Sequence, residues 1–61
     1  MKTSELIKLL VASGCYIVRN GKRHDIWHSP KTGMDFTVPR HAAKELPTGT
    51  ANNILRGAGL K

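Results

Sequence analysis

The sequence predicts a small α+β domain in which a helix, three strands and a second helix follow one another along 61 residues. One segment at each end of the chain has apolar residues at helical spacing. Between them lie three short segments rich in β-branched and aromatic residues, separated by turn residues. Strands joined by short turns pair antiparallel, so we expect a three-stranded antiparallel sheet with two helices packed on one face.

The first helix is expected over residues 4–13. Its apolar side is formed by Leu6, Ile7, Leu10 and Val11. Thr3 or Ser4 could cap its start, and Gly14 is suited to end it.

The last helix is expected over roughly residues 49–58. Its apolar residues fit the spacing i, i+3, i+4, i+7, and they are Ala51, Ile54, Leu55 and Ala58. Thr48 could cap the start, and Gly59 could end the helix in a left-handed conformation. Gly57 inside this helix costs ~1 kcal/mol relative to alanine.

The strands are expected at 15–19, 22–28 and 34–38. Asn-Gly at 20–21 favours a two-residue type I′ turn, and residues 29–33 form the next loop. These turns place Ile17 opposite His24 and Phe36 opposite Ile26. They predict a helix-facing side made of Cys15, Ile17, Ile26, Met34, Phe36 and Val38, with His24 at its end. Tyr16 and Trp27 would then lie on the other side, where they could stack on a base, meet a partner or shield the surface.

Charge and size restrict the function classes. Ten lysine and arginine residues outnumber four aspartate and glutamate residues, which gives a net charge of +6. Such a field attracts phosphate-rich polymers or acidic proteins, although it could also serve solubility alone. We expect residues 1–61 to form one domain with a thin core, so an active site should be a shallow groove.

Cysteine usage and hydropathy add further limits. Cys15 is the only cysteine, so no internal disulfide can form, and the usual four-ligand zinc patterns are absent. No apolar run approaches the ~20 residues of a membrane span. We therefore expect an intracellular protein without a metal or another cofactor.

The stretch "GKRHDIWH", residues 21–28, holds the strongest candidate for chemistry. His24 could take and give a proton near neutral pH, or it could be an ordinary polar residue of a strand. His28 is expected at a partly exposed strand end, too far along the strand to act on the same phosphate. His41, after Arg40, could be a secondary acid–base residue, a phosphate ligand or a structural residue.

The order helix, three strands, helix resembles the double-stranded-RNA-binding-like fold. Within it, "DFTVPRHAAKELPTGTANNILRGAGL" resembles the second half of HicA-type toxins, the mRNA interferases of bacterial and archaeal toxin–antitoxin pairs. The strand–Pro–basic–His run at 37–41, "KEL" at 44–46, "GT" at 49–50 and the "IL…AGL" ending carry the resemblance. It extends over nearly the whole chain.

The resemblance implies a cytoplasmic toxin that cleaves mRNA without a metal, with His24 as the catalytic residue and a HicB-type antitoxin as partner. The family usually has Gly-Ser before this histidine, where this chain has Lys22-Arg23. We expect an RNA-binding track made of Arg19, Lys22, Arg23, Arg40 and Lys44. The alternatives are a non-catalytic RNA-binding module of the same fold and a basic protein that only holds an acidic partner.

Overall fold

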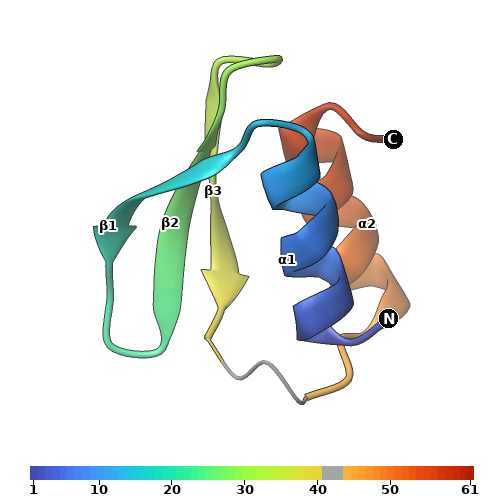
Figure 1. Ribbon diagram of the computed structural model, residues 1–61. Helices are drawn as coiled ribbons and strands as arrows, with labels where there is room; N and C mark the ends of the chain where they lie inside the picture. Colours follow the sequence, from blue (N-terminus) through green and yellow to red (C-terminus); the bar gives the residue numbers. More distant parts are fainter. Residues whose placement is uncertain (41–43) are drawn as a thin grey trace.

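The computed structural model describes residues 1–40 and 44–61, and it confirms the predicted order of elements (Figure 1). The elements are α1 (Thr3–Ala12), β1 (Tyr16–Asn20), β2 (His24–Ser29), β3 (Met34–Pro39) and α2 (Thr48–Ala58). The three strands form one antiparallel sheet in the order β1-β2-β3. Within the described residues, neither helix is long and apolar enough to cross a membrane.

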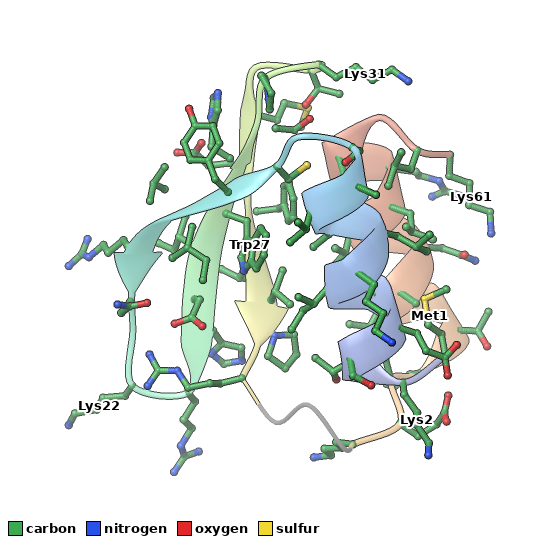
Figure 2. The ribbon with its side chains drawn as sticks, in the orientation of Figure 1. Met1, Lys2, Lys22, Trp27, Lys31 and Lys61 are labelled. Atoms are coloured by element: carbon green, nitrogen blue, oxygen red, sulfur yellow. The ribbon has the colours of Figure 1, made fainter. Side chains whose placement is uncertain are left out.

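Both helices lie against one face of the sheet, and the core fills the space between the two layers (Figures 1 and 2). The core residues come from every element except β1, and from the segments that flank the helices. They are Leu6, Leu10, Cys15, Trp27, Val38, Leu46, Ala51, Ile54 and Ala58. The opposite face of the sheet is covered by neither helix and is called the open face below.

The predicted helix ends are confirmed at the glycines. Gly14 has φ of 91°, and the N–H of the next residue, Cys15, donates to the carbonyl of Leu10 at 2.9 Å. Gly59 has φ of 81°, and the N–H of Leu60 donates to Leu55 in the same way at 2.8 Å. In both places the left-handed residue lets the chain turn back and satisfy carbonyl groups of the last helical turn.

The predicted helix caps are wrong, because no side chain caps either start. The residues before the helices are Lys2 and Pro47. Thr3 instead lies fully buried in the first turn of α1, where its N–H and its hydroxyl both donate to the carbonyl of Lys44 at 3.1 Å. Thr3 therefore attaches α1 to the segment that precedes α2.

The predicted turn at residues 20–21 is also wrong. Asn20 still belongs to β1 and pairs with Asp25, and the N–H of Gly21 donates to the carbonyl of His24 at 2.9 Å. The chain therefore reverses at residues 22–23. Gly21 does not have a positive φ, but a Cβ built on it would lie 2.5 Å from the His24 carbonyl oxygen. Glycine is required there by close packing of the backbone.

The predicted strand register is wrong by one residue between β2 and β3, where Trp27 pairs with Phe36 and Asp25 with Val38. Because a one-residue shift exchanges the two faces of a strand, Trp27 points into the core and is only 5% exposed (Figure 2). His24 and Ile26 consequently lie on the open face. The observed register buries the largest side chain of the domain, which the predicted one left in solvent.

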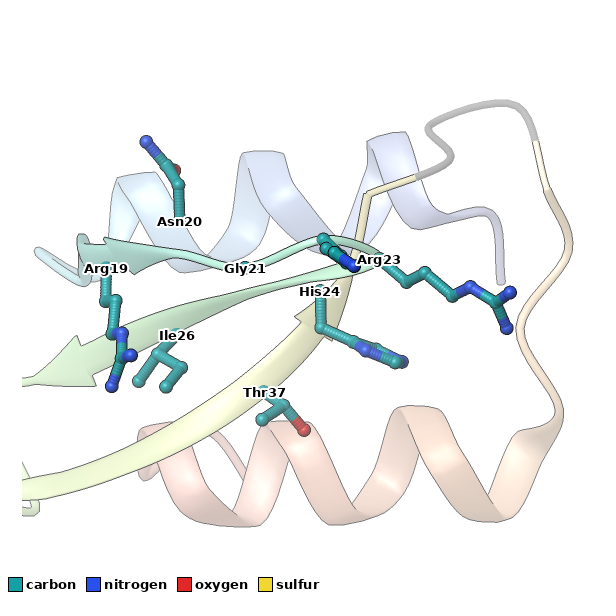
Figure 3. Close-up of a pocket in the computed structure, with 8 residues that line it drawn as sticks. Arg19, Asn20, Gly21, Arg23, His24, Ile26 and Thr37 are labelled. Carbon is teal, nitrogen blue, oxygen red and sulfur yellow. The ribbon is translucent and has the colours of Figure 1, made fainter.

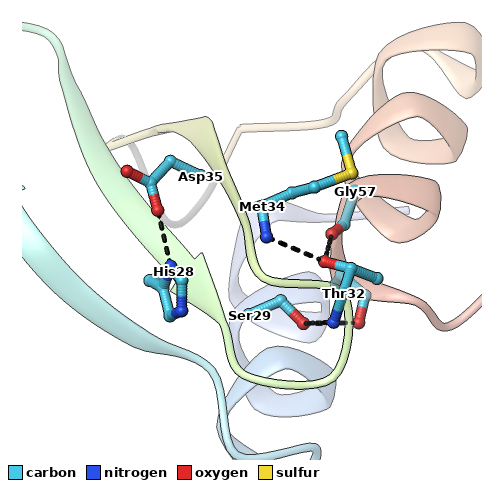
Figure 4. Close-up of polar contacts among 7 residues, drawn as sticks. His28, Ser29, Thr32, Met34, Asp35 and Gly57 are labelled. Carbon is cyan, nitrogen blue, oxygen red and sulfur yellow. Dashed lines mark hydrogen bonds and ion pairs between the residues drawn. The ribbon is translucent and has the colours of Figure 1, made fainter.

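The loop between β2 and β3 is fastened to the end of α2 (Figure 4). The buried Ser29 hydroxyl donates to the carbonyl of Ala58 at 2.9 Å, and the Thr32 hydroxyl donates to that of Gly57 at 2.6 Å. These bonds satisfy carbonyl groups that the helix end leaves without an intrahelical partner. They fix α2 across the sheet at the end opposite His24.

Candidate functional site

His24 is the first residue of β2 and lies exposed on the open face, opposite Pro39 of β3. It lines two hollows of the surface, with volumes of about 550 Å³ and 470 Å³. Arg23 is the other residue that both hollows share. The imidazole is therefore accessible to a large substrate that lies across both hollows.

The larger hollow lies on the open face beside the β1–β2 turn (Figure 3). Its lining comes from the turn and from all three strands: Arg19, Asn20, Gly21, Lys22, Arg23, His24, Ile26 and Thr37. Arg19 pairs with Ile26, and Ile26 pairs with Thr37, so these three side chains emerge from the same face. The hollow thus combines an apolar floor at the half-buried Ile26 with cations on its rim.

The smaller hollow lies between the end of the sheet and the start of α2. Its lining joins Arg23 and His24 to Pro39, to the segment 44–47 and to Thr50 in the first turn of α2. Thr3 holds the Lys44 carbonyl, and the N–H of Leu46 donates to the Met1 carbonyl at 2.9 Å. The start of α1 therefore positions Lys44 beside the histidine.

Four of the five cations predicted to bind RNA line these hollows, namely Arg19, Lys22, Arg23 and Lys44. None of them takes part in an ion pair within residues 1–40 and 44–61. Lys22 projects from the tip of the hairpin (Figure 2). Glu45 also lines the smaller hollow, but its carboxylate is paired with the N-terminal amino group. Cations that are not paired with a carboxylate keep more of their attraction for phosphate.

Arg40, the fifth predicted cation, is already engaged. Its Nη2 lies 2.7 Å from Oδ1 of Asp25 and also donates to the carbonyl of Gly21, while its Nε lies 3.2 Å from the same Oδ1. Its backbone N–H donates to the Arg23 carbonyl at 3.2 Å. Arg40 therefore connects the end of β3 to the turn that carries His24, and its binding to RNA stays a prediction.

Asp25 completes this contact, a role that was not predicted from the sequence. The Asp25 side chain is 15% exposed, whereas that of Arg40 is 46% exposed. The two residues are 15 positions apart in the chain. The sequence gives no signal for this pairing, because the contact exists only in the register that the structure adopts.

His28 lies at the far end of β2 from His24, on the same face. As predicted, it is a partly exposed residue near the end of the strand. Its Nδ1 lies 2.6 Å from Oδ1 of Asp35 (Figure 4). Its ring lies 5.5 Å from that of Tyr16. This pair is separated from His24 by ~13 Å of strand, so the two histidines cannot act on one phosphate.

His41, the predicted secondary acid–base residue, lies outside the described residues. The structure brings together His24, Arg19, Lys22, Arg23 and Lys44 around the two hollows. Trp27 was predicted to lie on the surface, where it could stack on a base, and this prediction is wrong because Trp27 belongs to the core.

An exposed imidazole between cationic hollows can exchange protons with a phosphodiester that lies across it. A family model described as the HicA toxin of bacterial toxin–antitoxin systems matches residues 3–60. Comparison with curated proteins and with solved structures gave no match. Since the family model extends over nearly all 61 residues, the chain belongs to the HicA toxin family of bacterial toxin–antitoxin systems.

Proposed function

We propose that this toxin is a metal-independent endoribonuclease that cleaves single-stranded mRNA, with His24 as its acid–base residue. The observation that carries the proposal is the position of His24, exposed where two hollows meet and surrounded by unpaired cations among the described residues. Cleavage of mRNA would inhibit translation and growth, which accounts for the toxicity of a protein of this family.

The reaction would use the nucleophile that RNA itself provides. His24 takes the proton of the ribose 2′-OH, and the 2′-oxygen attacks the adjacent phosphorus. The bond from phosphorus to the 5′-oxygen breaks, and this leaving oxygen receives a proton. The products are a 2′,3′-cyclic phosphate and a 5′-hydroxyl, and no metal is needed to generate the nucleophile. His41, predicted as a secondary acid–base residue, is the candidate donor of the proton that the leaving oxygen receives.

The cations would supply electrostatic stabilisation. Negative charge builds up on the phosphorane oxygens during the attack, and Lys22 and Arg23 are adjacent in the turn that precedes His24. Gly-Ser at these positions would let a backbone approach the phosphate closely. Lys22 and Arg23 instead attract the phosphate through their charge. This attraction compensates for the close backbone approach that Gly-Ser would allow.

We further propose a HicB-type antitoxin as the partner that silences this activity. An acidic surface would complement the net charge of +6 and cover Lys22, Arg23 and Lys44 in one step. RNA and antitoxin should then compete for the toxin. A ternary complex of toxin, antitoxin and uncut RNA would show that inhibition works in another way.

The proposed reaction is tested by its products. The purified chain is incubated with single-stranded RNA in EDTA, and the fragment ends are identified by mass spectrometry. We expect 2′,3′-cyclic phosphate or its opened form, together with 5′-hydroxyl ends, and no cleavage of the all-DNA analogue. Fragments with 5′-phosphate ends would contradict this mechanism. RNA that is bound but never cut would favour the non-catalytic RNA-binding module.

A further inference from the structure

We propose that Tyr16, supported by His28 and Asp35, forms a subsite that stacks on one base of the single-stranded RNA, away from the cleaved bond. The subsite lies on the open face, at the opposite end of β2 from His24. The inference rests on the proposed function, which supplies its ligand, single-stranded RNA. It adds the part of the protein surface along which that RNA would lie.

The aromatic ring of Tyr16 is held in place by its neighbours. Tyr16 and His28 are directly opposite in the β1–β2 pair, and their ring centroids lie 5.5 Å apart with an angle of 50° between the planes. The ring of His28 is in turn fixed by Asp35, whose Oδ1 lies 2.6 Å from Nδ1. A ring oriented in this way loses little conformational entropy when a base stacks on it.

A β-bulge joins this subsite to the hollow beside His24. The pairing shifts between Ile17 and Arg19, so Val18 is an extra residue in β1. Without the bulge, Tyr16 and Arg19 would point to opposite faces, because they are three positions apart. With it, both emerge on the open face, Tyr16 opposite His28 and Arg19 opposite Ile26.

The open face therefore carries one continuous surface along β2. His24, Ile26 and His28 alternate along the strand and span ~13 Å, a distance that a short run of nucleotides can cover. Cations gather at the His24 end, whereas the His28 end carries the carboxylate of Asp35. Phosphate groups should consequently follow the cations, and the surface near Asp35 should receive a base.

The use of aromatic residues in this chain points to the same ligand. Trp27 is buried and Phe36 packs against the core, but Tyr16 is 51% exposed. Proteins that bind single strands combine a basic groove with an exposed aromatic side chain on which a base stacks. The open face holds both, in that order, starting at the proposed catalytic residue.

The test measures binding without cleavage, so that it does not depend on the reaction. A single-stranded RNA with 2′-O-methyl groups cannot supply the nucleophile, and its dissociation constant can be measured by fluorescence anisotropy. Tyr16→Leu should raise Kd about tenfold, because stacking of one base is lost, whereas Tyr16→Phe should change it little. Val11→Ala, a change at the most exposed large apolar residue of α1, serves as the matched control and should have no effect.

An abasic scan of the same oligonucleotide tests the contact itself. Removing the base at one position should weaken binding to the wild-type protein about tenfold but should not weaken binding to Tyr16→Leu any further. The wild-type half of this scan needs no variant, so it stands even if Tyr16→Leu fails to fold.

Three results would overturn the subsite: no sensitive position in the wild-type scan, unchanged RNA binding by folded Tyr16→Leu, or loss of antitoxin binding alone in that variant. In each of them, cleavage by the wild-type protein could still be intact, so the proposed function would survive. Conversely, a toxin that stacks the base and never cuts RNA would confirm the subsite and refute the nuclease. A wild-type protein that binds no single-stranded oligonucleotide would refute both.

Discussion

Replacing Gly21 with alanine should destabilise the domain markedly, because this glycine lies under the backbone of the catalytic candidate. The new Cβ would be 2.5 Å from the carbonyl oxygen of His24, closer than the 3.0 Å below which real Cβ atoms essentially never lie. Relieving this contact should break the 2.9 Å hydrogen bond from Gly21 to His24. The lost bond and the strain together predict a loss of about 1–3 kcal/mol. A domain of this size has only ~3–5 kcal/mol of stability.

Urea unfolding, monitored by the fluorescence of the single buried Trp27, measures this loss. Gly49→Ala is the matched control, because a Cβ at Gly49 meets nothing within 4 Å and alanine favours the helix. The control should be neutral or stabilising by up to about 1 kcal/mol. If Gly21→Ala is as stable as Gly49→Ala, the close packing of the turn is refuted. The RNA cleavage rate of Gly21→Ala should also fall, since the turn carries His24.

A change at the neighbouring residue tests where the chain reverses. In a type I′ turn at residues 20–21, Asn20 would need a positive φ, which a β-branched residue adopts only at a high cost. In the structure Asn20 is an exposed strand residue opposite Asp25. We therefore expect Asn20→Thr to change stability by less than about 0.5 kcal/mol. A much larger loss of stability would indicate that the chain reverses at residues 20–21, as the sequence predicts.

Three further predictions concern the surroundings of His24 and the packing of α2 on the sheet. Arg40→Ala should lower the free energy of unfolding in urea by about 1–2 kcal/mol, because the mostly buried carboxylate of Asp25 loses its partner. An unchanged unfolding midpoint would show that the contact does not stabilise the domain. The logarithm of the RNA association constant should fall with the logarithm of the salt concentration at a slope of ~−3 if about four phosphates are engaged. Neutralising Lys22 should flatten this slope by less than one unit, and a slope of about zero would contradict the RNA-binding track. Gly57→Ala should be neutral or stabilising by up to about 1 kcal/mol, since its Cβ would meet Phe36 at an ordinary 3.4 Å; a clear loss of stability would show that the helix cannot accept the contact.

Features decided by local chemistry could be predicted from the sequence. The helix ends at Gly14 and Gly59 depend on a left-handed residue and on hydrogen bonds within a few positions, so the residue type alone indicates them. The order of elements follows from the apolar spacing in the same way. His24 could be selected as the catalytic candidate from its residue type and its resemblance to the family.

Features decided by tertiary packing could not be predicted in this way. Asn-Gly is a strong local turn signal, yet the register that buries Trp27 places the turn two residues later. A bulge at Val18 then changes which side chains of β1 share a face, and a bulge leaves no mark in the apolar pattern. Because the predicted register was wrong, His24 was expected on the helix-facing side of the sheet, and the contact of Asp25 with Arg40 was not predicted.

The cleavage rate of His24→Ala shows whether His24 performs the chemistry. The side chain is exposed, so the variant should fold as the wild-type protein does, with the same Trp27 fluorescence. Its Kd for the 2′-O-methyl RNA should stay within a few fold, while its cleavage of ordinary RNA should fall by about 10²–10⁴-fold, the usual contribution of a general acid–base residue, or by more. A folded His24→Ala variant that cuts RNA at nearly the wild-type rate would show that His24 is not the acid–base residue.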